Sequence, residues 1–267
     1  MKSSLSYCGQ VVRENDPDRF LLSMFAPHDR REDLWALFAF NHEIAKTREV
    51  VSETQLGLVR LQWWREAVGK IFEGGEIPAH EVLKALAPAI KTHRLPKYLF
   101  DTLVYAREFD LENVRPASID GLLSYADFTT TPLMSLAVMI CGDEPDMDPV
   151  AAVSVNYALA GLLRAVPSMA AQRRCYLPED LMERHGVTLT QMFDFLKPEA
   201  GIKEVAREVA AQFVPGIRPS SRFLKATQAL AGIYMRQIRR RGYDLYSPKM
   251  QLPPAFKELR VTAAAGL

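Results

Sequence analysis

The side chains that most often do chemistry occur here without the spacing of a self-sufficient site. The densest group of carboxylates is Asp143, Glu144, Asp146 and Asp148. Carboxylates hold a divalent cation when the fold points them at one ion. Two prolines interrupt this stretch, so no single helix can place the carboxylates on one face. We therefore expect a solvated loop between two helices, not a metal site.

The densest group of basic residues comprises Arg236, Arg239, Arg240 and Arg241. It falls at the C-terminal end of a predicted helix, where positive charge stabilises the helix dipole and the side chains face water. Weak contact with an anionic membrane surface is the alternative interpretation.

No local motif assigns a reaction to the chain. The sequence contains no glycine-rich nucleotide loop, no Walker sequence, no GxSxG elbow and no EF-hand loop. His42 and Glu43 begin like a zinc-protease motif, but Lys46 occupies the place of its second histidine. The three cysteines are widely separated, which favours a reducing compartment and argues against disulfides or a zinc site.

The composition is that of a globular protein. The 267 residues include 33 Lys+Arg and 32 Asp+Glu, for a net charge of +1, and 48% are hydrophobic. We therefore expect no nucleic-acid partner. No uninterrupted apolar run approaches about 18 residues, and residues 1–10 lack the apolar core of a secretory signal. These features predict no membrane-spanning helix and a cytoplasmic location.

Helical periodicity extends over almost the whole sequence, and no segment alternates like a strand. We expect a single all-α domain over residues 1–267. Pro132 should kink or split one helix, and Pro167 should end another. The helices are expected at about 17–26, 29–51, 53–73, 78–93, 96–113, 118–141, 149–166, 220–241 and 252–267.

Four blocks, in the same order along the chain, resemble squalene and phytoene synthases. Residues 20–23 and 34–41 resemble the start of the first catalytic helix, and residues 122–129 resemble the central helix. Residues 163–166 and 174–180 match the second motif and its tail, and residues 240–247 match the C-terminal signature. The resemblance covers about residues 17–260. It implies an all-α isoprenoid-synthase-like helical bundle with a central cavity.

The resemblance also implies where catalytic residues should lie. Family members join two prenyl diphosphates head to head, and Mg²⁺ neutralises the leaving diphosphate. The metal ligands are aspartates four residues apart on two facing helices, so both carboxylates of a helix share one face. The first motif, Asp-Asp-x-x-Asp, falls on residues 45–49 and places Lys46 at its second aspartate. The second motif, Asp-x-x-x-Asp, falls on residues 165–169. The four outer ligand positions are Ala45, Glu49, Ala165 and Met169.

Only Glu49 is acidic among those four positions, and Lys46 reverses the charge beside it. We therefore expect no catalytic residues, no metal site, no cofactor and no enzymatic turnover. This degenerate pattern, with Phe40-Asn41-His42-Glu43, resembles the branch that contains mitochondrial assembly factors for NADH:ubiquinone oxidoreductase (complex I). The resemblance implies a role in assembling that complex. The partners would be its subunits or other assembly factors, on the matrix-like side, peripheral to the inner membrane.

Two alternatives stay open. The first is a prenyl-diphosphate transferase with an atypical site, which would need Mg²⁺. The second is a module that binds an isoprenoid or another lipid in the old cavity. Under either alternative, the expected phosphate or ligand contacts are Lys46, Arg48, Glu49, Arg164, Tyr125 and Phe128.

Overall fold

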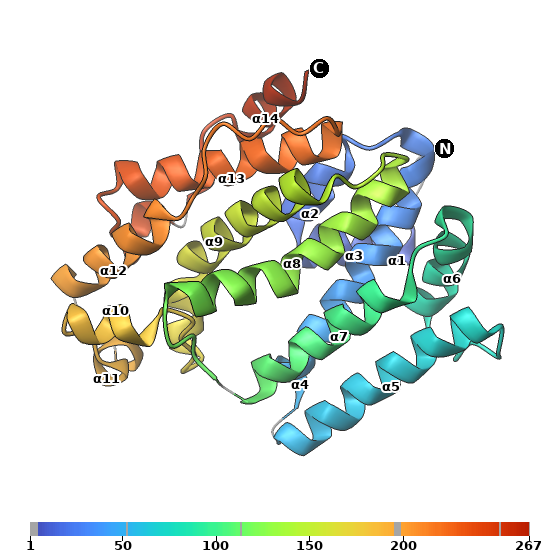
Figure 1. The fold of residues 1–267 in the computed structure, drawn as a ribbon, viewed down its shortest axis with the longest axis horizontal. Coiled ribbons are helices and arrows are strands. Elements are labelled where there is room, and N and C mark those ends of the chain that lie inside the picture. Colours follow the sequence, from blue (N-terminus) through green and yellow to red (C-terminus); the bar gives the residue numbers. More distant parts are fainter. Residues whose placement is uncertain (1–4, 52, 113, 195–198, 251, 267) are drawn as a thin grey trace. The chain divides into compact units, whose positions relative to one another are not determined.

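The computed structural model describes residues 5–51, 53–112, 114–194, 199–250 and 252–266. The chain is 74% helical, and these residues contain no strand, which confirms the predicted all-α class. Figure 1 shows the order of the elements. They are α1 (Tyr7–Asn15), α2 (Pro17–Ser23), η1 (His28–Arg30), α3 (Arg31–Ala45), α4 (Thr47–Val50), α5 (Thr54–Glu73), α6 (Glu81–His93), α7 (Lys97–Glu112), α8 (Ile119–Cys141), α9 (Met147–Ala171), α10 (Glu179–Arg184), α11 (Leu189–Phe193), α12 (Glu199–Ala211), α13 (Arg222–Arg240), η2 (Pro248–Met250) and α14 (Lys257–Ala265).

Several helix ends follow directly from local sequence. The Asp16 side chain caps α2 by accepting a hydrogen bond from the Arg19 N–H at 2.9 Å, and Pro17 occupies the first turn. Gly74 ends α5 in the left-handed conformation (φ 74°), which glycine adopts without strain. These boundaries were expected from the sequence, and the structure confirms them.

The predicted effect of the internal prolines is wrong for Pro167. Helix α9 continues through it to Ala171. Proline removes one helical hydrogen bond, but Leu163, Val166 and Ala170 are buried on both sides of it, so packing holds the two parts together. Likewise α8 is a single helix through Pro132, so the predicted split does not occur there.

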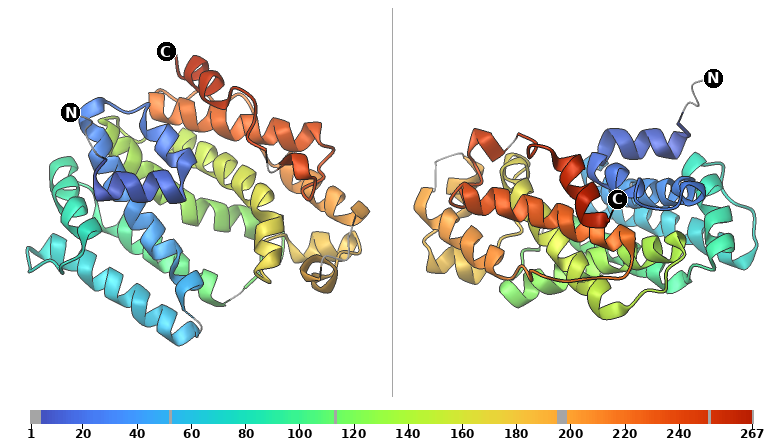
Figure 2. Two further views of the ribbon diagram at one scale, coloured as in Figure 1. Left: turned by 180° about the vertical axis from the view of Figure 1, so that it is seen from behind. Right: turned by 90° about the horizontal axis from the view of Figure 1, so that it is seen from above.

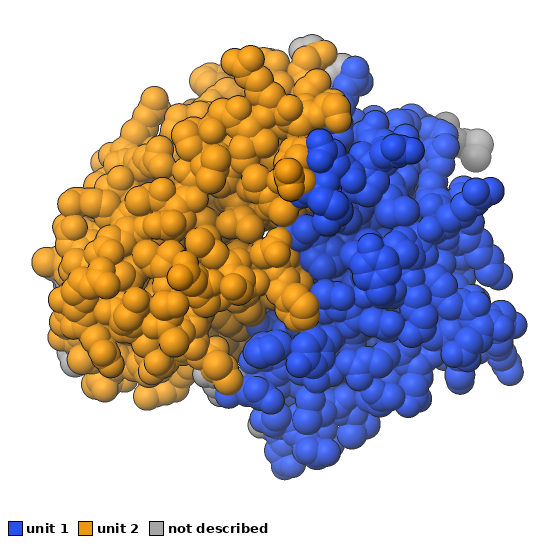
Figure 3. Space-filling view, viewed as in Figure 1, with its two compact units in different colours: residues 1–112, 131–147, 221–223 blue, residues 113–130, 148–220, 224–267 orange. Residues whose placement is uncertain are grey.

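The contacts of the chain define two compact units, coloured separately in Figure 3. Unit 1 comprises residues 1–112, 131–147 and 221–223. Unit 2 comprises residues 113–130, 148–220 and 224–267. Each unit is assembled from segments far apart in the sequence. The single domain over residues 1–267 stays a prediction.

An aromatic cluster organises the core of unit 1. Phe40 of α3 meets Trp64 of α5 and Phe100 of α7 edge to face, with ring centroids 5.7 and 5.6 Å apart. All three rings are almost fully buried. Helices α5 and α7 pack closely because Gly57 leaves room: a Cβ there would lie 2.6 Å from Cδ2 of Leu111. The two further views in Figure 2 show that α3, α5, α6 and α7 lie close together in space within unit 1.

Helix α9 carries the core of unit 2. The buried Asn156 side chain donates to the Val214 carbonyl at 2.7 Å and accepts from the Val214 N–H at 2.9 Å. This pair of hydrogen bonds ties the segment after α12 to α9.

Helix α9 is also long and apolar enough to cross a bilayer, with a mean hydropathy of 1.4 over its most apolar window. The sequence predicted no such helix. The indication is weak, because core helices of water-soluble proteins pass the same test, and 44% of that window is buried within the protein.

Candidate functional site

The helix expected over residues 29–51 is broken at the first motif. Helix α3 ends at Ala45, and the short α4 begins at Thr47. Between them the Lys46 N–H points back to the carbonyls of His42 and Ile44, while its own carbonyl accepts from the Glu49 N–H at 2.8 Å. The Lys46 carbonyl also accepts from the Val50 N–H at 3.2 Å, and Lys46 itself keeps the right-handed helical conformation (φ −70°, ψ −7°). Residues 45 and 49 therefore belong to two helices that only Lys46 separates.

Lys46 is engaged in an internal ion pair. Its ammonium contacts Oε1 of Glu43, and the guanidinium of Arg60 on α5 contacts Oε2 at 3.1 Å. The Glu43 side chain is only 5% exposed, whereas those of Lys46 and Arg60 are about one third exposed. A buried carboxylate is costly unless cations neutralise it. The residue at the second aspartate position of the first motif thus neutralises Glu43.

A second buried polar contact joins α3 to α7. The Asn41 side-chain oxygen accepts a hydrogen bond from Arg107 at 3.2 Å, and Arg107 pairs with Asp110 at 3.1 Å. Together with Phe40 and Glu43, Asn41 makes the segment 40–43 a junction of three helices. The sequence marked this segment only as a resemblance. Its partners on α5 and α7 could not be assigned from spacing along the chain.

His42, in the same segment, is partly buried. Burial lowers the pKa of His42, and the neighbouring Lys46 ammonium lowers it further. Its imidazole is therefore neutral near pH 7 and adds no positive charge to this part of α3.

The remaining first-motif residues do not form a metal site. Glu49 is exposed, and Ala45 and Arg48 are partly exposed. Among the residues that the structure describes, no three His, Cys, Asp or Glu side chains gather in a way that could hold a metal ion. Mg²⁺ requires several oxygen ligands, and an alanine, a lysine and one exposed glutamate do not fit it.

In unit 2, Arg164 packs against an aromatic ring. Its guanidinium lies 3.5 Å from the centroid of Tyr234 on α13. Lys257 of α14 lies 3.4 Å from the Tyr234 hydroxyl. A guanidinium over a tyrosine face is a favourable cation–π contact. Ala165 follows on α9 and is partly exposed, so this part of the second motif supplies no carboxylate.

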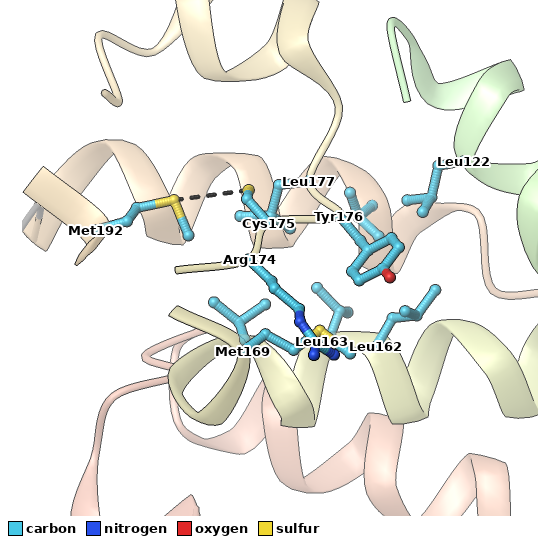
Figure 4. Close-up of a pocket in the computed structure, with 11 residues that line it drawn as sticks. Leu122, Leu162, Leu163, Met169, Arg174, Cys175, Tyr176, Leu177 and Met192 are labelled. Atoms are coloured by element: carbon cyan, nitrogen blue, oxygen red, sulfur yellow. Dashed lines mark hydrogen bonds between the residues drawn. The ribbon is translucent and has the colours of Figure 1, made fainter. Parts of the chain in front are cut away.

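A small apolar pocket lies within unit 2, between α9 and the segment 174–177 (Figure 4). Its cavity volume is only about 10 Å³, which is close to the space of one water molecule. Met169, at the last position of the second motif, lines it, and Arg174 extends toward α9. The remaining lining residues are Leu122, Leu162, Leu163, Val166, Cys175, Tyr176, Leu177, Met192 and Val209.

The other predicted ligand contacts in unit 2 lie outside this lining. Tyr125 stacks on Tyr176 with ring centroids 5.1 Å apart, so it packs against a residue that lines the pocket. Phe128 is 37% exposed and does not line the pocket. The pocket is therefore a narrow gap in an apolar wall beside the Arg174 guanidinium. The larger central cavity implied by the resemblance stays a prediction.

The cysteines are not suited to nucleophilic chemistry. The Cys175 sulfur lies 3.6 Å from the sulfur of Met182 and 3.8 Å from that of Met192, and burial raises the pKa of Cys175. Burial also raises the pKa of Cys8 to about 11 and that of Cys141 to about 12. All three thiols are therefore protonated near pH 7, and thiols react as thiolates.

We expect Glu43→Gln to lower the free energy of unfolding by about 1–3 kcal/mol. The loss is smaller than for a fully buried pair because Lys46 and Arg60 keep partial access to water. The matched control is Glu66→Gln on the exposed face of α5, which should change stability by less than about 0.5 kcal/mol. Guanidinium denaturation followed by circular dichroism measures both.

A double-mutant cycle separates the ion pair from a general effect of the substitution. Glu43→Gln combined with Arg60→Gln should cost less than the sum of the two single changes. Strict additivity would contradict the assigned contact.

The chain is similar to known proteins over most of its length. A family model described as squalene/phytoene synthase matches residues 12–260. The Bos taurus protein named NADH dehydrogenase (ubiquinone) complex I, assembly factor 6 is 30% identical over 261 residues, which cover 92% of this chain and 77% of that protein. Phytoene synthase 3, chloroplastic, from Zea mays is 24% identical over 202 residues, covering 73% and 47%.

The fold is also similar to a solved structure. A dehydrosqualene synthase in complex with ligand superposes with a TM-score of 0.73 at 17% identity, over 97% of this chain and 94% of that one. The resemblance inferred from the four sequence blocks is confirmed: the chain belongs to the squalene/phytoene synthase family.

Proposed function

We propose that this chain is a non-catalytic member of its family that acts in assembling the membrane enzyme NADH:ubiquinone oxidoreductase (complex I). The observation that carries the proposal is the ion pair between Lys46 and Glu43. It places a positive charge, already engaged inside the fold, where head-to-head synthases need a metal-binding carboxylate. The relative named as a complex I assembly factor supports the choice of complex.

The loss of ligands is too extensive for ordinary family chemistry. Removing one charge-stabilising group commonly costs about 10²–10³ in rate. Here three of the four outer carboxylate positions are Ala45, Ala165 and Met169, and the fourth, Glu49, is exposed. We therefore propose that the chain performs no turnover and binds no Mg²⁺.

In this proposal, the role in assembly depends on binding surfaces of the folded protein and not on catalysis. Subunits or other assembly factors of the respiratory complex are the proposed partners. The proposed location is the matrix-like side of the energy-conserving membrane, in a peripheral position. A mitochondrial association agrees with the relatives named for complex I assembly.

One observation favours a second function, binding of a lipid or isoprenoid. The pocket of unit 2 is lined almost entirely by apolar side chains, with Arg174 as its single charged residue. A short apolar group with an anionic end would match the chemistry of this lining, and its binding would require the cavity to widen from about 10 Å³. Organic extraction of the purified protein, followed by mass spectrometry, tests it: a stoichiometric lipid supports binding, and lipid at the level of an unrelated protein argues against it.

We expect no prenyl transfer from the purified chain. Incubation with farnesyl or geranylgeranyl diphosphate and Mg²⁺ should release no squalene, phytoene or cyclopropyl intermediate above a protein-free control, because the oxygen ligands for the metal are missing. Chromatography of the extracted products measures this. Product that grows with protein concentration would promote the transferase alternative.

Deletion of the gene tests the assembly role. We expect less assembled complex I in membranes and lower NADH:quinone activity, with carotenoid or hopanoid content unchanged. Native electrophoresis, an activity assay and lipid analysis give the three readouts. Normal complex I accompanied by lost isoprenoids would reverse the assignment.

A further inference from the structure

The C-terminal part of the chain is much more basic than the whole. Residues 222–267 contain nine basic and two acidic side chains, although the complete chain has a net charge of only +1. Helix α13 alone carries five basic residues and no acidic one. Such asymmetry in a nearly neutral protein indicates a surface that attracts anions.

The basic residues of this part gather on exposed surface. Arg236, Arg239 and Arg240 are exposed on α13. Helix α14 lies beside α13 (Figures 1 and 2), held by the contact between Lys257 and Tyr234. It brings Arg260 to the same region. Arg236 and Arg240 lie four residues apart on α13 and so share one face of that helix. Partial burial lowers the pKa of Arg236, and the positive charges of Arg260 and Arg240 lower it further.

The acidic side chains of this part offset little of that charge. Asp244 lies 3.9 Å from Lys203, which itself comes from α12. Glu258 is exposed on α14 and removes one unit of charge. Arg239 donates to the Ala210 carbonyl at 3.2 Å and is less available than its neighbours. Arg236, Arg240 and Arg260 are the remaining core of the positive region.

Large apolar side chains project from the same part of unit 2. Leu252, Phe256 and Leu259 are 62%, 76% and 66% exposed, and Phe256 is the most exposed large hydrophobic residue among those described. Its backbone is left-handed (φ 53°), a conformation that is uncommon for a bulky residue. Such strain tends to occur at functional positions. An exposed aromatic ring in this conformation gains nothing from packing within the chain.

We propose that this chain docks onto an anionic lipid bilayer through the α13–α14 surface. The surface is defined by the basic residues Arg236, Arg240 and Arg260 and the apolar residues Leu252, Phe256 and Leu259. The guanidinium groups would lie at the level of the phosphates, and the apolar side chains would enter the boundary between headgroups and acyl chains. The inference rests on the peripheral membrane position proposed above and names the surface that makes the contact.

The mixture of side chains favours a bilayer over other anionic partners. A nucleic-acid surface would need the positive charge but would leave Leu252, Phe256 and Leu259 in water. Complementing the dipole of α13 explains Arg239 and Arg240 near its end. Stabilisation of the α13 dipole does not explain Arg260, which lies on another helix, or the exposed Phe256. A bilayer with anionic headgroups accommodates both kinds of side chain at once.

Vesicle flotation of the full chain tests the proposal. We expect binding to vesicles of phosphatidylcholine with phosphatidylglycerol, little binding to phosphatidylcholine alone, and release by high KCl. The triple variant Arg236→Gln, Arg240→Gln, Arg260→Gln should lower the partition coefficient on the order of 100-fold. Phe256→Ser should lower it by about 10-fold, because the ring no longer enters the bilayer.

The matched control removes the same charge elsewhere. Lys84, Lys97 and Arg173 are exposed residues outside the α13–α14 surface, and changing all three to Gln should leave binding within a few-fold of the parent. Equal losses in both triple variants would overturn the proposal, because net charge alone would then explain the binding. Binding to an RNA oligomer but not to vesicles, lost in the α13–α14 variant, would also overturn it.

The fluorescence of a new tryptophan tests the depth of contact. Phe256→Trp should show a blue-shifted emission and quenching by brominated lipid when anionic vesicles are added. Tyr98→Trp, at a site of unit 1 that is 65% exposed, should show neither. A response at residue 98 and none at residue 256 would contradict the assigned surface.

Discussion

The Glu43 carboxylate, buried next to an aromatic cluster, has to be neutralised, and the first-motif region depends on how this is done. Lys46 and Arg60 each contact one of its oxygens. The first contact brings the chain after α3 back onto that helix, and the second joins α3 to α5. Phe40 and Asn41 extend the same junction to α7. Because an unpaired buried charge is strongly destabilising, this arrangement leaves Lys46 no freedom to serve a ligand.

The chain keeps the scaffold of its family but lacks most of the carboxylates that the family's metal chemistry uses. The squalene/phytoene synthase pattern extends over residues 12–260. Three of the four outer positions that would hold Mg²⁺ are alanine or methionine, and the fourth is the exposed Glu49. In unit 2, Arg164 stacks on Tyr234, and Met169 contributes to an apolar wall. Motif positions in both units therefore have structural roles. A protein preserved in this way is expected to act through what its surfaces bind.

Local sequence predicted those features of the fold that depend on a few neighbouring residues. The Asp16 cap and the Gly74 end are of this kind, because a side-chain cap or a positive φ is a local matter. The break at Lys46 and the continuity of α9 through Pro167 were missed, because distant packing and ion pairing decide them. The loss of carboxylates from the two motifs could be seen from residue types alone. The partners Arg60 and Arg107 could not, since they lie on helices whose placement only the tertiary structure gives.

Glu49 offers the most direct test of the central claim that the fold works without the family's metal chemistry, because it is the one carboxylate left among the outer motif positions. In a strain that lacks the gene, a Glu49→Gln copy expressed at the parental level should restore assembled complex I, measured by native electrophoresis with in-gel NADH oxidation, to the level given by the parental copy. Failure of the stable, fully expressed Glu49→Gln protein to restore the complex would contradict the account, since it would show that a metal-type carboxylate is still required.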